Sequence, residues 1–395
     1  MVGAVGAQSG GRAGTPYRRR VVHIRPEPVL PAYGCACLTS IVPSLLSADP
    51  TARDWMPEPV RAASQVVLLV LDGLGWDQLQ ARAALAPVLV SMEGGSITSV
   101  APTTTATALT SISTGLPPAQ HGVVGYRVRV GSREVLNVLR WTTSSGDARA
   151  VVRPESFQPH PPFGGTGPPV VTRAEFAATG FTSAHLGGAR LNGWRLPSGL
   201  VVEVRRLLEA GEPFVYAYYD GVDKVAHDRG FGDYYDAELA FVDRMVGDLA
   251  AVLPPGAALV VTSDHGQVEV TGPGITLAPE LAADVDLLSG EGRFRWLHAR
   301  PGTAARMAAT AERLYGDMAW VRSRQDMVYE GWLGGTPSPE IEHRLGDVAL
   351  VPFEPVAFLD PSDTGESRLV CRHGSLTAAE VLVPLLVKSA PGGGG

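Results

Sequence analysis

The chain has 395 residues, 45% of them hydrophobic, which allows one large buried core or two to three smaller domains. Its formal net charge is −7 and its sequence pI is near 5.7, which argues against a protein that grips a nucleic-acid backbone. The longest unbroken aliphatic run, Val66 to Leu71, is far too short to cross a membrane. We therefore expect neither a nucleic-acid polymer nor a membrane as partner.

The N-terminal segment and the three cysteines indicate in which cellular compartment the protein is expected. Residues 1–20 predict a disordered tail, and their opening lacks the sustained apolar stretch of a secretory signal. Cys35 and Cys37 are too close together for a comfortable disulfide, and Cys371 stands alone. Free thiols in a reducing compartment are the expectation, which makes the protein cytoplasmic.

The first elements follow a proline-rich arm. A short helix is expected near Leu38–Leu46. Next comes Val66–Leu71, a run of β-branched residues and leucine without polar alternation. Such a run predicts a strand buried on both faces, as in a parallel sheet covered by helices. Residues 126–180 are polar and rich in proline and glycine, and they predict a loop-rich insertion.

Three later runs have the same apolar character. Two of them, Phe214–Tyr219 and Ala257–Thr262, flank a helical pattern at Tyr234–Leu253. The third, Val381–Val387, contains Pro384, which favours an edge strand or a bulged one. Because strands alternate with helices, we expect α/β layering.

A second departure from this rhythm covers residues 272–350. It contains an expected strand at Phe294–His298, a helix at Thr303–Tyr315 and a second strand at Met318–Arg322, with a short apolar run from Asp347 to Pro352 at its boundary. This β-α-β pattern predicts a small inserted cap. Insertions between site residues tend to cover a pocket and select its substrate.

Metal-type ligands stand at or near the ends of the expected core strands. They are Asp72, Asp223, His227, Asp264, His265 and His373. In open α/β sheets ligands bind beyond the carboxyl ends of the strands, so these residues can converge without being close in sequence. Asp223 and His227 also have the spacing of one helical face. Three carboxylates and three imidazoles are enough for two divalent ions, a set that suits zinc and tolerates manganese or iron.

Each of these residues also has a simpler interpretation. A lone aspartate after a strand is most often a turn former or a helix cap, and a lone histidine is more often a packed or exposed imidazole. The threonine-rich stretch 101–126, APTTTATALTSISTGLPPAQHGVVGY, could cap a helix with its hydroxyls. It could also offer a nucleophilic hydroxyl at a helix N-terminus, where the dipole and a bound metal favour the alkoxide. Beside six metal-type ligands, the nucleophile is the favoured interpretation.

The order of these motifs resembles a known family. An aspartate, a P-T-x-T motif followed by TGLxPxxHG, then DxxxH, SDHG and a late HG are similar to the type I phosphodiesterase/nucleotide pyrophosphatase family of the alkaline phosphatase superfamily. The resemblance spans residues 66–387. It implies a three-layer α/β/α core with a mostly parallel central sheet, formed by residues 21–271 and 351–395, and a small α+β cap inserted at 272–350.

Laid on the family pattern, the nucleophile falls on Thr105. The resemblance implies two metal sites, one formed by Asp72, Thr105, Asp264 and His265 and the other by Asp223, His227 and His373. Two departures concern the substrate. Thr104 stands where pyrophosphatase relatives usually have lysine, and Tyr126 stands where they usually have an asparagine that donates to a phosphate oxygen. Tyr126 is therefore the candidate substrate-binding residue, either as a donor or by packing.

The resemblance implies a metal-dependent phosphodiesterase or nucleotide pyrophosphatase that works through a threonyl-phosphate intermediate. Its substrate would be a small phosphate ester, with a nucleotide as one candidate. A phosphomonoesterase or a phosphonate hydrolase on the same core is the alternative, and a phosphosugar mutase is a more distant one. A sulfatase of the formylglycine type needs cysteine or serine at the nucleophile position, which TTTAT lacks. A metal-binding protein without activity is the rival from another class.

Overall fold

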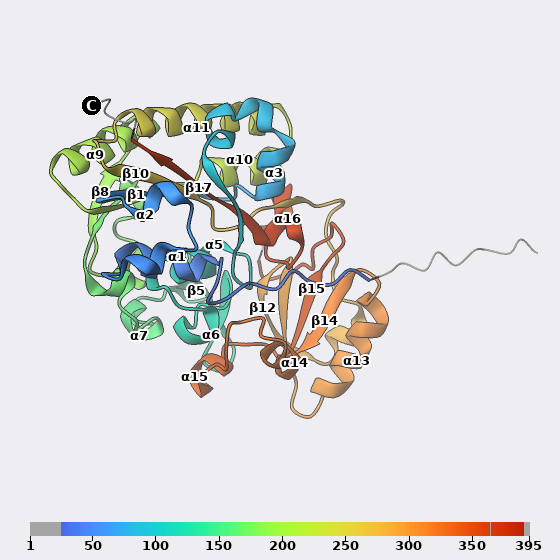
Figure 1. Cartoon of the computed structure of the whole chain (residues 1–395). Coiled ribbons are helices and arrows are strands. Elements are labelled where there is room, and N and C mark those ends of the chain that lie inside the picture. The colour runs from blue at the N-terminus through green and yellow to red at the C-terminus, as the bar shows by residue number, and fades with distance from the viewer. Residues whose placement is uncertain (1–24, 364, 391–395) are drawn as a thin grey trace, which may run out of the picture.

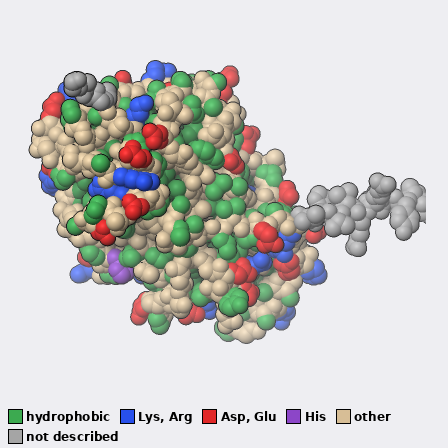
Figure 2. Space-filling model, viewed as in Figure 1, with side chains coloured by type: hydrophobic (Ala, Val, Ile, Leu, Met, Phe, Trp, Pro, Cys, Tyr) green, Lys and Arg blue, Asp and Glu red, His purple; other side chains and the backbone are tan. Residues whose placement is uncertain are grey.

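The computed structural model describes residues 25–363 and 365–390, so the expected tail at residues 1–20 lies outside the described residues. A larger α/β unit lies beside a smaller sheet with its own helices (Figure 1). Within these ranges, no helix combines the length and the apolar character needed to cross a bilayer. On the face drawn in Figure 2, basic side chains lie next to acidic ones.

The larger unit is built on a seven-stranded sheet with the strand order β2-β17-β10-β1-β9-β7-β8. Its strands are β1 (Gln65–Leu71), β2 (Glu93–Thr98), β7 (Pro169–Arg173), β8 (Arg190–Trp194), β9 (Phe214–Tyr219), β10 (Ala257–Thr262) and β17 (Leu382–Ser389). Strands β10, β1, β9, β7 and β8 run parallel, and β17 runs antiparallel to both of its neighbours. The expected mostly parallel sheet is confirmed.

The position of strand β1 in the fold explains why its sequence does not alternate between apolar and polar residues. Val66 and Leu68 pack into one apolar cluster, together with helices α1 (Leu38–Leu46) and α5 (Thr105–Thr114). The alternate residue Val67 packs into a second cluster on the opposite face. Because both faces are covered, every position of the strand favours an apolar side chain.

The second face is covered by helices α9 (Pro197–Glu209) and α11 (Asp233–Ala251), whose buried residues Leu200 and Val242 belong to the second cluster. Helices α9 and α11 lie above the sheet in Figure 1, and α1 and α5 lie below it. The expected three-layer α/β/α arrangement is therefore present. The helix expected at Tyr234–Leu253 is confirmed as α11.

The expectation that Pro384 marks an edge or bulged strand is wrong. Strand β17 lies between β10 and β2 and is thus internal to the sheet. Pro384 pairs with Ser96 of β2, whereas the pairing with β10 begins only at Leu385. At Pro384, strand β17 is therefore paired with β2 but not yet with β10. The N–H that proline lacks is not needed there for a hydrogen bond to β10.

The smaller unit is an antiparallel sheet of four strands in the order β12-β13-β15-β14. Its elements are β12 (Val285–Glu291), β13 (Phe294–Ala299), α13 (Ala304–Tyr315), β14 (Ala319–Ser323) and β15 (Val348–Pro352). The elements expected near β13, α13 and β14 are confirmed, whereas β12 was not expected. The division of the chain at residues 272 and 350 stays a prediction, and β15 runs across the second of these positions.

Residues 126–180 contain more regular structure than the loop-rich insertion that the sequence indicates. Strands β3 (Arg127–Val130), β4 (Glu134–Asn137), β5 (Thr142–Thr143) and β6 (Gly146–Asp147) form a small antiparallel sheet. Strand β7, in the same stretch, belongs to the central sheet. These strands are short, so a pattern of alternating residues has little length in which to show itself.

Candidate active site

The carboxyl ends of β1, β9 and β10 bring the predicted ligands together. Asp72 follows β1 directly, and Asp264 stands two positions after the end of β10. Asp223 lies in the first turn of helix α10 (Gly221–Arg229), which follows β9. Because β1 pairs in parallel with both β9 and β10, the three strands end at one edge of the sheet.

The first cluster consists of Asp72, Asp264 and His265, whose ligand atoms all lie within 4.8 Å of one another. The Nε2 atom of His265 is 3.5 Å from Oδ1 of Asp72 and 3.4 Å from Oδ2 of Asp264. All three residues are buried. The hydroxyl of Thr105 lies 3.2 Å from the same Nε2 atom, so the predicted nucleophile adjoins this cluster.

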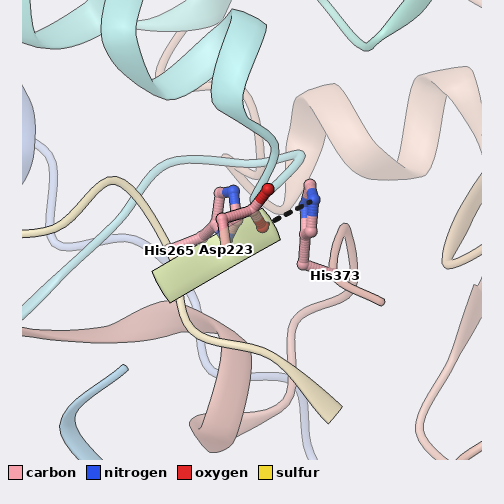
Figure 3. Close-up of side chains that lie close together, drawn as sticks. All are labelled: Asp223, His265 and His373. Carbon is pink, nitrogen blue, oxygen red and sulfur yellow. Dashed lines mark ion pairs between the residues drawn. The ribbon is translucent and has the colours of Figure 1, made fainter. Parts of the chain in front are cut away.

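The second cluster consists of Asp223, His265 and His373, and Figure 3 shows the three side chains converging beside α10. This grouping differs from the predicted one, in which His227 stands in place of His265. His227 still lies close, with its Nε2 atom 3.3 Å from Oδ1 of Asp223. The rings of His265 and His373 stack with their centroids 3.6 Å apart, so His265 belongs to both clusters.

The three imidazoles are held in a common way. The Nδ1 atom of His227 lies 2.7 Å from the carbonyl oxygen of Cys371, and that of His373 lies 2.9 Å from the carbonyl oxygen of Thr103. Nδ1 of His265 likewise lies 3.1 Å from a backbone carbonyl. A hydrogen bond from Nδ1–H fixes the tautomer in which Nε2 has a free lone pair, as a metal ligand requires.

Two buried carboxylate oxygens indicate that the first cluster fits a cation. Oδ1 of Asp72 and Oδ2 of Asp264 have no hydrogen-bond partner among the described residues. Burial raises the pKa of Asp72 well above its usual range, and the nearby carboxylates of Asp264 and Asp223 raise it further. An uncompensated group of buried carboxylates is costly, and a divalent ion between them would offset that cost. The donor set therefore suits a divalent metal.

The imidazole of His373 is suited to the same role. Burial lowers the pKa of His373 well below its usual value, and the neighbouring rings of His265 and His227 lower it further. The ring is therefore neutral at physiological pH. Neutral imidazole is the form that binds a metal.

Thr105 begins helix α5, and the structure weakens the simple capping interpretation of the threonine-rich stretch. Thr104 occupies the N-cap position, yet its side chain makes no capping hydrogen bond. The hydroxyl of Thr103 donates to the carbonyl oxygen of Ser375 and accepts from the N–H of Gly374, so it ties α5 to the segment next to His373. Thr105 alone of the three points its hydroxyl at a ligand cluster.

A cavity of about 670 Å³ opens on Thr105, Asp223, His227 and His373, and Tyr126 forms part of its wall. The Tyr126 hydroxyl accepts a hydrogen bond of 2.6 Å from the side-chain amide of Asn137. Burial raises the pKa of Tyr126, so the phenol keeps its proton. The substrate-binding role of Tyr126, as a donor or by packing, stays a prediction.

A second cavity of about 240 Å³ reaches Thr105 and Asp223 from another side. Its walls are largely aromatic and aliphatic, with Phe176, Phe181 and Tyr216 among them. Such walls accept an apolar or aromatic group. Thr105 thus stands where the two cavities meet.

Sequence reasoning missed two residues that hold the ligands. The Tyr218 hydroxyl donates to Oδ2 of Asp72, and the Gln267 side-chain amide donates to Oδ1 of Asp223 at 3.0 Å. Gln267 follows Gly266 directly in the TSDHGQ motif, which is a signal that could have found it. Tyr218 lies inside an all-apolar strand, where nothing in the pattern separates it from a core residue.

The three-layer fold and the two clusters of candidate ligands at the carboxyl edge of its sheet fit a hydrolase of the alkaline phosphatase superfamily. The sequence matches the model of the type I phosphodiesterase/nucleotide pyrophosphatase family over residues 66–193 and 190–375. The chain belongs to that family and is a phosphoric ester hydrolase. Enzymes of the family typically depend on divalent metals. Among curated proteins, none matches the chain in sequence.

Solved structures show the same fold. Murine ectonucleotide pyrophosphatase/phosphodiesterase 5, in an inactive threonine-to-alanine variant with AMP, is 16% identical, with a TM-score of 0.60 over 82% of this chain and 87% of that one. Phosphonoacetate hydrolase from Sinorhizobium meliloti, in complex with phosphonoacetate, is 19% identical, with a TM-score of 0.60 over 84% of this chain and 93% of that one.

Proposed function

We propose that the chain is a phosphodiesterase that binds two divalent ions, zinc by preference, and uses Thr105 as its nucleophile. The observation that carries this proposal is the position of the Thr105 hydroxyl, 3.2 Å from Nε2 of His265. His265 belongs to both ligand clusters. A hydroxyl at this point adjoins both groups of metal ligands at once, which is where an attacking oxygen has to be.

The chemistry proceeds by two displacements at phosphorus. The Thr105 oxygen forms a bond to phosphorus as the bond to the leaving alcohol breaks, which gives a threonyl-phosphate ester. Water then cleaves that ester, releases a phosphate monoester and returns the Thr105 hydroxyl. The two clusters would hold the divalent ions, which when bound would supply positive charge that favours the threonine alkoxide and offsets the charge on the phosphoryl oxygens.

The chain's own residues orient both steps. The N-terminus of α5 directs its free backbone N–H groups toward the phosphoryl oxygens, where the helix dipole favours negative charge. Tyr126 donates its phenolic proton to a substrate oxygen in the larger cavity. In the inactive variant of the murine relative, a threonine is replaced by alanine, which supports a threonine nucleophile here.

Two cavities on Thr105 favour a diester over a monoester. A diester carries two organic groups, and the larger cavity and the apolar one give each of them a place.

A phosphonate hydrolase is the second candidate, because the phosphonoacetate hydrolase fold covers most of this chain. A panel of bis-p-nitrophenyl phosphate, p-nitrophenyl phosphate and p-nitrophenyl phenylphosphonate separates the candidates. We expect the highest kcat/KM for the diester. A clear preference for the monoester would replace the diesterase with a phosphatase, and a preference for the phosphonate would favour the second candidate.

A further inference from the structure

The side chain of Arg372, next to His373 in sequence, is buried without a full set of partners. It is 4% exposed, and its Nη1 atom has no hydrogen-bond partner among the described residues. Its Nε–H donates to the carbonyl oxygen of Leu369 at 3.4 Å. The nearest carboxylate oxygen, Oε1 of Glu366, is 4.0 Å from Nη1. A guanidinium has five N–H groups to satisfy, so this one is under-partnered.

The carboxylate of Glu366 is shared between Arg372 and a second, closer arginine. Nη2 of Arg295 donates to both oxygens of Glu366, at 2.8 Å and 2.6 Å. Burial lowers the pKa of Arg372, the carboxylates of Glu366 and Asp363 oppose this effect, and the positive charges of Arg295 and Arg293 add to it. A buried and incompletely paired cation is costly, so an anion brought beside it binds strongly.

The side chain of Arg372 borders the larger cavity. Arg372 and Gly292 both belong to the cavity wall, which also includes Thr105. Gly292 lies between β12 and β13, and a Cβ atom built there would be 3.0 Å from Nη1 of Arg372. A side chain at position 292 would therefore press on Nη1 and on Oε1 of Glu366, which would be 2.5 Å away. Glycine lets the Arg372 side chain pack here, with Nη1 itself buried beneath the cavity wall.

We propose that Arg372 binds a second anionic group of the substrate, a carboxylate or a phosphate, in the wall of the cavity that also contains Thr105. This assignment rests on the proposed function, since it deepens the same site. The substrate would then be a phosphodiester in which one ester group ends in an anion. That group lies in the larger cavity, and the apolar group lies in the smaller one.

Three other arginines belong to the cavity wall, and none of them is a buried cation without a partner. Arg140 is exposed, so solvent screens its charge. Arg127 is paired with Asp360, and the exposed Arg133 is paired with Asp286. Glu291 of β12 is one of the acids of the same wall, and burial raises its pKa to about 8. At neutral pH its carboxyl group is therefore mostly uncharged, and it does not repel an anion in the cavity.

The test compares p-nitrophenyl phosphodiesters whose second arm is ethyl, 2-carboxyethyl or 2-phosphonoethyl. In the wild-type enzyme we expect an anionic arm to raise kcat/KM about tenfold or more over the ethyl arm, as a charge-assisted hydrogen bond in a buried site allows. Arg372→Met should bring that ratio near one. Arg133→Met, which removes an exposed arginine of the same wall, should keep it. The arm with the larger gain identifies carboxylate or phosphate as the preferred anion.

A wild-type ratio near one, or a gain that persists in Arg372→Met, overturns the assignment of Arg372. Failure to cleave any of the three diesters contradicts the proposed function instead. If no diester is cleaved, or if Arg372→Met does not fold, the anion site is tested by calorimetric titration of the wild-type enzyme with ethylphosphonate and with 2-carboxyethylphosphonate. Binding of the carboxylate compound about tenfold tighter supports the anion site, and equal binding contradicts it.

Discussion

At the scale of single residues, His265 lies at the centre of the candidate site and belongs to both ligand clusters. Its Nε2 atom lies within 3.5 Å of Thr105, Asp72 and Asp264 side-chain oxygens, and its ring stacks on His373. One imidazole cannot donate its single Nε2 lone pair to two ions. The ring therefore has to commit to one cluster when metal binds, and the sequence pattern assigns it to the cluster of Asp72.

This shared position makes a prediction about metal content. His265→Ala should lower bound metal from about two ions per chain to one or fewer, because two-metal sites lose affinity when a ligand is removed. His227→Ala should also lose one ion if His227 is a ligand, as its 3.3 Å approach to Asp223 indicates. Elemental analysis of both variants is the measurement, and full occupancy in His227→Ala would assign the second site to Asp223, His265 and His373 without it.

A second prediction concerns the nucleophile. Thr105→Ala should abolish turnover, by about 10³-fold or more, while metal content stays near the wild-type value, since the carboxylates and imidazoles remain. Thr104→Ala should keep much more activity, because the Thr104 side chain makes no capping bond. Steady-state kinetics and metal analysis of the pair check this. A dead Thr104→Ala beside an active Thr105→Ala would move the nucleophile by one position.

A third prediction uses the buried acid Glu291. Its pKa is about 8 in the folded chain, above the ordinary value of a glutamate, so the folded state binds more protons than the unfolded state between pH 5 and pH 8. The stability that the protonated group contributes is complete at the acidic end of this window and is lost as pH rises through 8. Relative to wild type, Glu291→Gln should gain about 2–5 kcal/mol of unfolding free energy over the window.

Urea denaturation of wild type and Glu291→Gln at pH 5.5 and pH 8.5 measures this difference. The amide oxygen of glutamine can still accept the N–H of Tyr126, which now donates to Glu291 at 2.9 Å. A difference in stability that does not change with pH would show that Glu291 is ionised in the folded protein.

At the scale of elements, the long apolar runs could be predicted and the short or polar strands could not. Phe214–Tyr219 and Ala257–Thr262 match β9 and β10 residue for residue because both faces of these strands are buried. Strand β8, Arg190–Trp194, contains Asn192 and Gly193 and is mostly accessible, so its sequence has no apolar signal. It joins the sheet only because β7 offers it a parallel edge.

The candidate site shows the same division. The ligands could be predicted from DxxxH, SDHG and the late HG because each motif is local in sequence. Contacts made between distant elements could not. Tyr218 reaches Asp72 across neighbouring strands, and Arg372 faces Gly292 of the cap. Such pairings depend on the register of the sheet and on where the cap rests, which no local pattern encodes.

A fourth prediction concerns the contact between the cap and the core. Arg293, just before β13, makes two hydrogen bonds of 2.8 Å and 2.7 Å to Glu380 of α16 (Ala378–Val381), and both side chains are fully buried. Arg293→Met should destabilise the protein by about 3–5 kcal/mol, because it leaves a buried carboxylate unpaired. The double variant Arg293→Met/Glu380→Met should recover part of that loss.

Thermal or chemical denaturation of the two single variants and the double variant gives the coupling energy of the Arg293–Glu380 pair. Strictly additive effects would contradict the pairing. Arg313→Met is a suitable control, because its ion pair with Glu280 is exposed on both sides and contributes little.

At the scale of the whole molecule, the core supplies the ligands and the cap completes the cavity around them. The clusters lie at the carboxyl edge of the seven-stranded sheet, and β12 of the cap adds Glu291 and Leu287 to the wall of the larger cavity. The catalytic account therefore requires ions bound by the core, with the cap acting on the choice of substrate.

The most direct test of this account measures the metal content and the hydrolytic activity of the same protein preparation. Protein purified without chelator should contain about two divalent ions per chain by elemental analysis and cleave bis-p-nitrophenyl phosphate. Treatment with EDTA should remove both the ions and the activity, and added zinc or manganese should restore them. Full activity in a preparation shown to be free of metal would contradict the two-metal account.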